Sequence, residues 1–250
     1  MRTRVIEYGR AASQFVELTA PAAVGAPLAV LIHGGFWKSA YDADLARPLV
    51  PSLLDQGWAT LVVEYRRVGD GGGYPATLQD LAAAVDLLAD LDADVDLTRV
   101  VAVGHSAGGH LAAWLAARPR LPDGTPGARP RVTVSAVVAQ AGVLDLRAAA
   151  ADRLGDDAVV RFLGGEPEQA PLAYAAADPT AALPLGVPVL CVHGRDDDTV
   201  PPRQSTTFAE RAVAAGDPVE VRLVDGDHFA VIDPAGPAWA LTLDWLAEQV

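Results

Sequence analysis

The sequence predicts an α/β fold in which helices cover both faces of a mostly parallel, doubly wound sheet. Short runs rich in Val, Leu and Ile recur along the 250-residue chain and alternate with longer segments whose apolar residues have helical spacing. The short runs contain few polar positions, as expected of parallel strands that are buried on both faces. A chain of this length can form one large core, so we expect a single domain over residues 1–250.

The individual elements follow from the same pattern. An antiparallel hairpin is expected first, formed by RVIEYG and QFVELTA at one edge of the sheet. Six further strands are expected at 28–34, 59–65, 99–105, 134–141, 187–194 and 219–225. Helices are expected at 42–56, 74–91, 107–118, 202–216 and 236–250. Residues 143–182 are rich in Ala, Asp and Pro and interrupt the alternation, which predicts a small helical insertion acting as a cap.

The composition is that of a globular protein, with 51% hydrophobic and 20% charged residues. The formal net charge of −13 argues against a nucleic-acid partner, because phosphate binding requires clustered Lys and Arg. Cys191 is the only cysteine and cannot form a disulfide within the chain, which fits a reducing compartment. The N-terminus lacks the apolar core of a signal peptide, and the longest apolar run is too short to span a bilayer. We therefore expect a cytoplasmic protein without a membrane partner; the sequence leaves the oligomeric state open.

The stretch GHSAGG, residues 104–109, follows a predicted strand and opens a predicted helix. This is the G-x-S-x-G pattern of a nucleophile on a sharp turn, where Gly104 and Gly108 leave room for the crowded backbone. The alternative is a glycine-rich loop that contains Ser106 by chance. We favour the nucleophile because suitable partners lie downstream.

A serine hydroxyl needs a base within hydrogen-bond reach, and the base needs a carboxylate that orients it. The sequence offers carboxylates in HGRDDDTVP, residues 193–201, and a histidine in DGDHFAVIDP, residues 225–234, each directly after a predicted strand. Open α/β sheets build their sites at the carboxyl ends of the strands. The serine, acid and histidine loops are therefore expected to meet along one edge of the sheet.

Five histidines could supply the base: His33, His105, His110, His193 and His228. The first four lie in or beside the serine turn, or precede a glycine at a strand end, where packing or bracing of a loop explains them. The last follows the serine and the acid in the chain and lies in a loop after a strand. We therefore predict His228 as the base.

Four carboxylates could orient this base: Asp145, Asp196, Asp197 and Asp198. The last three are adjacent, and the first follows another predicted strand, so spacing does not choose among them. The physical requirement is a buried carboxylate that faces the ring N–H of His228.

A tetrahedral intermediate also needs backbone N–H groups that stabilise its oxyanion. One is expected from Ala107, the residue after the nucleophile, at the start of a helix. The others are expected from Gly35 and Phe36 in HGGFW, residues 33–37, where glycines let the backbone approach the substrate.

Position also predicts the walls of a substrate pocket. We expect Phe36, Trp37 and Phe229 to border it, because they lie in the loops nearest the serine. The insertion is expected to roof the pocket through Phe162 and Tyr174.

No cofactor and no metal ion are expected. GDGGGYP, residues 69–75, looks like a phosphate loop but lacks the G-x-x-x-x-G-K pattern, so we interpret it as a flexible loop. No spacing of His, Cys and carboxylates indicates a metal site. The expected partner is a small-molecule ester or amide substrate.

The stretches HGGFW, GHSAGGHLAAWLA, GVPVLCVHGRDDDTVP and GDHF together resemble the α/β-hydrolase superfamily. The similar branch contains hormone-sensitive-lipase-like esterases, kynurenine formamidases (arylformamidases) and prolyl-oligopeptidase-type catalytic domains. The resemblance begins at about residue 28 and implies the α/β-hydrolase fold. Its H-G-x-x-D-x-x-V-P pattern selects Asp197 as the acid. HGGFW is closer to the H-G-G-x-W of kynurenine formamidases than to the H-G-G-G of the lipase-like esterases.

The motifs and the resemblance predict a serine hydrolase that cleaves carboxylic esters of small to medium acyl groups through an acyl-enzyme on Ser106. Hydrolysis of an arylformamide is the first alternative. Less favoured alternatives are a peptidase-like hydrolase and a non-catalytic binding protein on the same fold.

Overall fold

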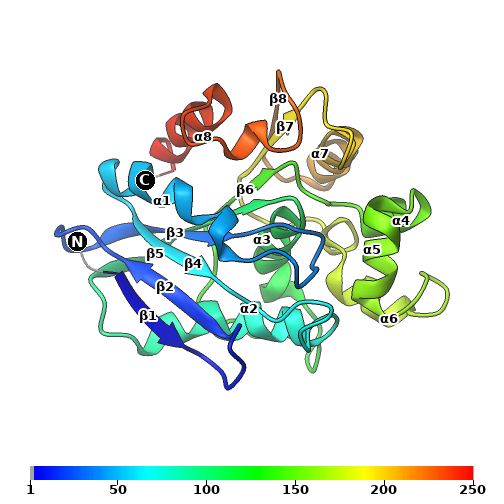
Figure 1. The fold of residues 1–250 in the computed structure, drawn as a ribbon, viewed down its shortest axis with the longest axis horizontal. Helices are drawn as coiled ribbons and strands as arrows, with labels where there is room; N and C mark the ends of the chain where they lie inside the picture. The colour runs from blue at the N-terminus through cyan, green and yellow to red at the C-terminus, as the bar shows by residue number, and fades with distance from the viewer. Residues whose placement is uncertain (1–2, 250) are drawn as a thin grey trace.

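One mixed sheet of eight strands forms the centre of the computed structural model, which describes residues 3–249, and its order is β1-β2-β4-β3-β5-β6-β7-β8 (Figure 1). The strands are β1 (Thr3–Glu7), β2 (Phe15–Thr19), β3 (Ala26–Ile32), β4 (Ala59–Val63), β5 (Val95–His105), β6 (Ala136–Gln140), β7 (Val189–Gly194) and β8 (Val219–Val224). The hairpin β1–β2 joins β4 antiparallel, and all other neighbouring strands are parallel. The predicted strands and the N-terminal hairpin are thus confirmed, with ends displaced by a few residues.

The helices are α1 (Val50–Asp55), α2 (Ala76–Asp86), α3 (Ala107–Ala117), α4 (Leu146–Ala151), α5 (Leu154–Leu163), α6 (Pro171–Ala177), α7 (Arg203–Ala215) and α8 (Pro237–Ala247). The prediction of one helix at 42–56 is wrong for the first half of this segment. That half forms two short 3-10 turns before α1. Pro48 and Pro51 lie at the starts of the second turn and of α1, where a missing N–H is tolerated but a continuous helix is not.

Alternate side chains of each central strand face opposite layers, which is the doubly wound arrangement that the apolar runs predict. In β3, Val30 and Ile32 belong to the larger core cluster, whereas Ala29 and Leu31 belong to the other. The larger cluster is covered by α2, α3 and α7, and the smaller by α1 and α8. Figure 1 shows α8 and α1 on one side of the sheet and α2 and α3 on the other.

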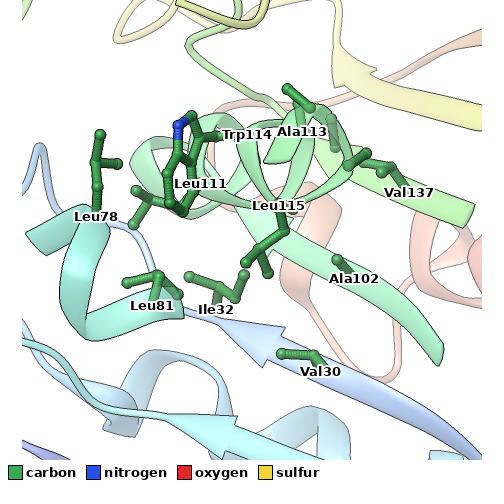
Figure 2. Packing of buried hydrophobic residues seen from close by; sticks show 14 of the residues in the cluster. Val30, Ile32, Leu78, Leu81, Ala102, Leu111, Ala113, Trp114, Leu115 and Val137 are labelled. Carbon is green, nitrogen blue, oxygen red and sulfur yellow. The ribbon is translucent and has the colours of Figure 1, made fainter. Parts of the chain in front are cut away.

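The helix α3 lies at the centre of the larger core and is buried at every position. Figure 2 shows Trp114 and Leu111 of α3 against Leu78 and Leu81 of α2, above β3. A helix that is apolar all round is a core helix rather than a surface helix. The serine turn that precedes α3 is therefore attached to a helix that is buried at every position.

Residues 69–75, predicted as a flexible loop, form a turn held by hydrogen bonds. Gly72 N donates to Arg67 O at 2.8 Å, and Tyr74 N donates to Phe162 O of the insertion at 2.7 Å. The turn is therefore hydrogen-bonded both to the segment that follows β4 and to α5.

Candidate active site

Ser106 lies between β5 and α3 with φ 57° and ψ −119°, so it adopts a left-handed φ that a non-glycine residue rarely takes. The turn requires glycines on both sides of the serine, because backbone atoms lie where a Cβ would be. A Cβ on Gly104 would come within 2.0 Å of Gly108 O, and one on Gly108 within 2.1 Å of Ile32 O. Both predicted glycine positions are thus required by close packing around the serine.

His228 and Asp197 meet at the end of the sheet, as the chain order predicts. His228 Nδ1 lies 2.7 Å from Asp197 Oδ2, and both residues are almost fully buried. The other oxygen of Asp197 accepts hydrogen bonds from the backbone N–H groups of Thr199 and Val200, at 2.9 and 2.8 Å. The carboxylate is therefore fixed on one side by the backbone and faces the histidine with the other.

The hydrogen bonds to Asp197 keep it ionised. Burial by itself would raise the pKa of this carboxyl, but the nearby ring of His193 and the hydrogen bonds from His228 and Val200 N outweigh burial and hold the pKa below its usual range. His193 Nε2 lies 3.1 Å from the same oxygen that binds His228. The place of His193 before a glycine at a strand end predicts only a loop brace, because nothing in its spacing indicates a contact with the acid.

The other carboxylates considered for this role lie elsewhere. Asp145 accepts a hydrogen bond from Ala148 N at the start of α4 and pairs with Arg211 at 2.7 Å. Asp196 and Asp198 are exposed. The geometry therefore selects Asp197, the residue that the family pattern selected.

A pocket of about 170 Å³ opens beside the serine turn. Its wall is formed by Gly35, Phe36, Tyr41, Leu45, His105, Ser106, Thr199, His228 and Phe229. Ser106 and His228 thus lie on one wall, with Phe229 half exposed at the mouth as predicted. The structure contains no hydrogen bond between the Ser106 hydroxyl and the His228 ring among the described residues, and such bonds often form only when substrate is bound. Tyr41, Leu45 and Thr199 lie in the wall without any signal in the sequence.

Trp37 does not border this pocket, so that prediction is wrong. Its side chain is fully buried, stacks on Phe162 with ring centroids 4.6 Å apart, and meets the edge of His110. Phe162 and Tyr174 are buried as well and do not roof the pocket. Large apolar side chains gain more by packing against each other in the core than by lining an open site.

The insertion instead supports the loop that carries Phe36. Lys38 Nζ donates to Gly155 O at 2.9 Å, and the Phe36 ring lies so close that a Cβ on Gly155 would approach it to 2.8 Å. The predicted helices of the insertion are confirmed, but they pack beside this loop rather than over the pocket.

The loop Gly34–Phe36 packs directly on the serine turn. A Cβ on Gly34 would lie 2.8 Å from His105 O and 2.9 Å from Ser106 Cβ. Gly35 has φ 102°, and a Cβ there would collide with Tyr41. Within residues 3–249, neither Gly35 N nor Phe36 N donates a hydrogen bond to the protein, so both remain available to a bound oxygen.

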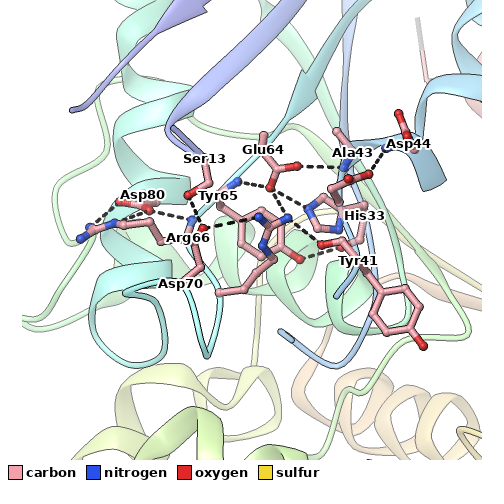
Figure 3. Close-up of polar contacts among 12 residues, drawn as sticks. Ser13, His33, Tyr41, Ala43, Asp44, Glu64, Tyr65, Arg66, Asp70 and Asp80 are labelled. Carbon is pink, nitrogen blue, oxygen red and sulfur yellow. Dashed lines mark hydrogen bonds and ion pairs between the residues drawn. The ribbon is translucent and has the colours of Figure 1, made fainter. Parts of the chain in front are cut away.

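The buried carboxylate of Glu64 stabilises the loop Gly34–Phe36 through His33 (Figure 3). Glu64 Oε1 lies 3.3 Å from His33 Nε2 and 2.7 Å from Arg67, and Oε2 accepts from Ala43 N at 2.9 Å. His33 Nδ1 in turn binds Gly34 O at 2.8 Å. Burial would raise the pKa of Glu64, but the hydrogen bond with His33 and the backbone donors lower it. The network fixes the backbone of the loop that contributes Gly35 to the pocket wall.

His105 connects the serine turn to the base loop. Its Nε2 lies 2.9 Å from the backbone oxygen of His228, to which it donates. Burial lowers the pKa of His105 to about 3, so the ring stays neutral beside His228 at ordinary pH. The sequence indicated only steric demands at this position.

No helix within residues 3–249 is long and apolar enough to cross a membrane. No three or more His, Cys, Asp or Glu side chains in the same residues gather closely enough to hold a metal ion.

Comparisons with known proteins bear on the family and the fold of the chain. The sequence model of the BD-FAE family matches residues 16–212. Esterase LipC from Mycobacterium tuberculosis is 28% identical over 203 residues, which are 74% of this chain and 48% of LipC. Kynurenine formamidase from Drosophila melanogaster is 29% identical over 126 residues, or 49% of this chain and 39% of the formamidase. The chain spans less than half the length of these curated relatives.

Solved structures share the fold over nearly the whole chain. A truncated carbohydrate esterase from gut microbiota has a TM-score of 0.86 at 20% identity, covering 100% of this chain and 96% of its own. Esterase 2 from Thermogutta terrifontis with bound propionate has a TM-score of 0.77 at 25% identity, covering 98% and 92%. The same esterase phosphoramylated by tabun gives a TM-score of 0.76 at 25% identity, with the same coverage. These similarities confirm the predicted α/β-hydrolase fold.

Proposed function

Because the chain belongs to the BD-FAE family, we propose that it is a carboxylic ester hydrolase with Ser106 as nucleophile, His228 as general base and Asp197 as the orienting acid. The proposal rests above all on the buried hydrogen bond between His228 and Asp197, beside a pocket whose wall includes Ser106. A serine, a histidine and a carboxylate at the ends of three parallel strands suit acyl transfer.

In the proposed reaction Ser106 Oγ forms a bond to the ester carbonyl carbon while His228 Nε2 takes the hydroxyl proton. The bond to the leaving oxygen then breaks, and His228 returns the proton to the departing alcohol. Water repeats both steps on the acyl-enzyme, which releases the acid and restores the serine. Asp197 holds Nδ1–H of His228 and stabilises the imidazolium without taking a proton.

The oxyanion of each tetrahedral intermediate is assigned to the N–H groups of Gly35, Phe36 and Ala107. Gly35 N and Phe36 N have no partner within the described residues, and Ala107 is the first residue of α3, where the helix dipole favours negative charge. The reaction requires no cofactor, because groups of the chain carry every proton transfer.

The size of the pocket favours acyl groups larger than formyl. Its volume of about 170 Å³ far exceeds the roughly 10–15 Å³ that admits one water molecule. The half-exposed rings of Tyr41 and Phe229 leave the mouth open. The propionate bound in esterase 2 of Thermogutta terrifontis is consistent with a small to medium acyl group here.

Arylformamide hydrolysis is the second candidate. The similarity to Drosophila kynurenine formamidase favours it, and Phe36, Tyr41 and Phe229 could stack on an aryl amine. The same serine mechanism would apply, with an amine as the leaving group.

The test compares hydrolysis of p-nitrophenyl acetate, p-nitrophenyl butyrate and an N-formyl aryl amine by the wild type and by Ser106→Ala. We expect the wild type to cleave both esters faster than the formamide and to bind a fluorophosphonate covalently at Ser106. The alanine variant should do neither while retaining its circular dichroism spectrum.

A faster reaction with the formamide would favour the second candidate. No turnover and no labelling of the wild type would contradict both, and would point to binding without catalysis on the same fold.

A further inference from the structure

We propose that His193 is a positioning residue that sets the basicity of Asp197, and thereby the pH at which His228 becomes an active base. The inference rests on the proposed function of the site. Asp197 Oδ2 faces two imidazole rings, with His228 Nδ1 at 2.7 Å and His193 Nε2 at 3.1 Å. One oxygen thus binds the ring of His228 and lies close to the ring N–H of His193, and only the His228 ring faces the pocket.

The proton of His193 is fixed on Nε2, the ring nitrogen nearest Asp197. Its Nε2 also lies 2.8 Å from the backbone oxygen of Val200, which can only accept a hydrogen bond, so Nε2 must carry the proton. Its Nδ1 lies 2.7 Å from the hydroxyl oxygen of Ser205, which can donate to this nitrogen. His193 and Ser205 are fully buried. The N–H of His193 Nε2 is therefore held on Val200 O, and Asp197 Oδ2 lies beside it, 3.1 Å from the same nitrogen.

An N–H dipole close to a carboxylate oxygen stabilises its negative charge and makes that oxygen a weaker base. Without the N–H of His193, Asp197 would stabilise the imidazolium form of His228 more, and His228 would keep its proton to higher pH. Besides Asp197, the titratable group that faces the His228 ring is His105, with ring centroids 4.6 Å apart. His105 stays neutral through burial, so His193 is the neighbour that adjusts the pair.

The experiment compares two variants of His193 whose amide side chains differ in length. His193→Gln places its N–H near the position of Nε2 and keeps an N–H dipole beside Asp197, whereas His193→Asn reaches only to the position of Nδ1. The control is His110→Asn, since His110 is also fully buried and binds a backbone oxygen, Ala177 O, through one ring nitrogen. The readouts are kcat/KM for p-nitrophenyl acetate against pH and the low-field proton NMR signal of the hydrogen bond between His228 and Asp197.

We expect His193→Asn to move the acid limb of the profile upward by about one pH unit and to shift the low-field signal. His193→Gln and His110→Asn should keep the wild-type limb and signal. Loss of activity in His193→Asn with an unchanged limb and signal would overturn the proposal, as would equal shifts in the Asn and Gln variants.

A second measurement needs no variant. Nitrogen-15 NMR of the wild type should show a proton on Nε2 of His193 throughout the active pH range, and an Nδ1–H tautomer would overturn the inference. If the wild type cleaves no ester, the proposed function fails, whereas the NMR signals still test the effect of His193 on the pair.

Discussion

Asp197 is almost fully buried, yet one of its oxygens accepts two backbone hydrogen bonds, and the other is bonded to His228 and lies 3.1 Å from His193 Nε2. A buried carboxylate is costly unless its oxygens are paired in this way. The donors leave the charge on Asp197 and direct one oxygen at His228. A neutral amide at this position would lose both the charge and the match to the ring N–H.

Asp197→Asn should lower kcat/KM for p-nitrophenyl acetate by roughly 10⁴-fold, because an amide favours the wrong tautomer of His228. Asp145→Asn should change it by less than about threefold, because its partners are Ala148 N and Arg211. Steady-state kinetics, with circular dichroism to verify folding, makes the comparison. A larger loss in the Asp145 variant would reverse the assignment of the acid.

Individual residues differ in how far the sequence could predict them. Ser106 and His228 follow from a motif and a chain order, whereas Asp197 needed the family pattern because its neighbours have the same spacing. Trp37 was misplaced because two successive residues with positive φ, Phe36 and Trp37, turn the indole into the core. A linear pattern carries no information about such a turn.

At the scale of elements, the N-terminus of α4 brings two acidic side chains together. Asp145 caps α4. Asp178 caps the 3-10 turn Pro179–Ala182 through Thr180 N, and its carboxylate lies near that of Asp145. Burial and the charge of Asp145 raise the pKa of Asp178 to about 6. The folded state thus binds a proton at Asp178 that the unfolded chain, with a value near 3.8, has already released.

Because the folded pKa is raised, the stabilisation linked to Asp178 is present below pH 3.8 and is lost as the pH rises through about 6. Asp178→Asn keeps an acceptor for Thr180 N without the charge. At pH 8 the variant should therefore be more stable by up to about 3 kcal/mol, with a flatter stability curve between pH 4 and 7. Urea unfolding at several pH values measures this. The exposed Asp225→Asn is the control, and an unchanged slope in Asp178→Asn would contradict the linkage.

The strands were predictable as elements because their apolar runs are short and bounded by turns. The segment before α1 was not, because Pro48 and Pro51 break a helical pattern that spacing alone makes continuous. The role of the insertion was predicted wrongly for a similar reason. Its composition indicated helices, but only packing decides which surface they cover.

At the scale of the whole molecule, the insertion and the sheet share one core. Phe162 and Tyr174 belong to the same buried cluster as Val30 and Trp114. We therefore expect the described residues to unfold as one cooperative unit rather than as a sheet domain with a separate cap.

Phe162→Ala should lower the free energy of unfolding by about 3–5 kcal/mol, because it removes the ring that stacks on Trp37. Far-ultraviolet circular dichroism and tryptophan fluorescence should report one coincident urea transition for both the wild type and the variant. Leu172→Ala, on an exposed position of α6, should change little. An early transition in one probe would show that the insertion unfolds by itself.

The hydrogen bond from Lys38 Nζ to Gly155 O lets chemical labelling report on the contact between the insertion and the loop that carries Phe36. Lys38 is the only lysine in the sequence, so an amine-reactive dye has one side-chain target. Its amine must leave the carbonyl before it can react. The rate of labelling therefore measures how often the insertion separates from the loop, and binding of a substrate analogue that holds the loop in place would slow it.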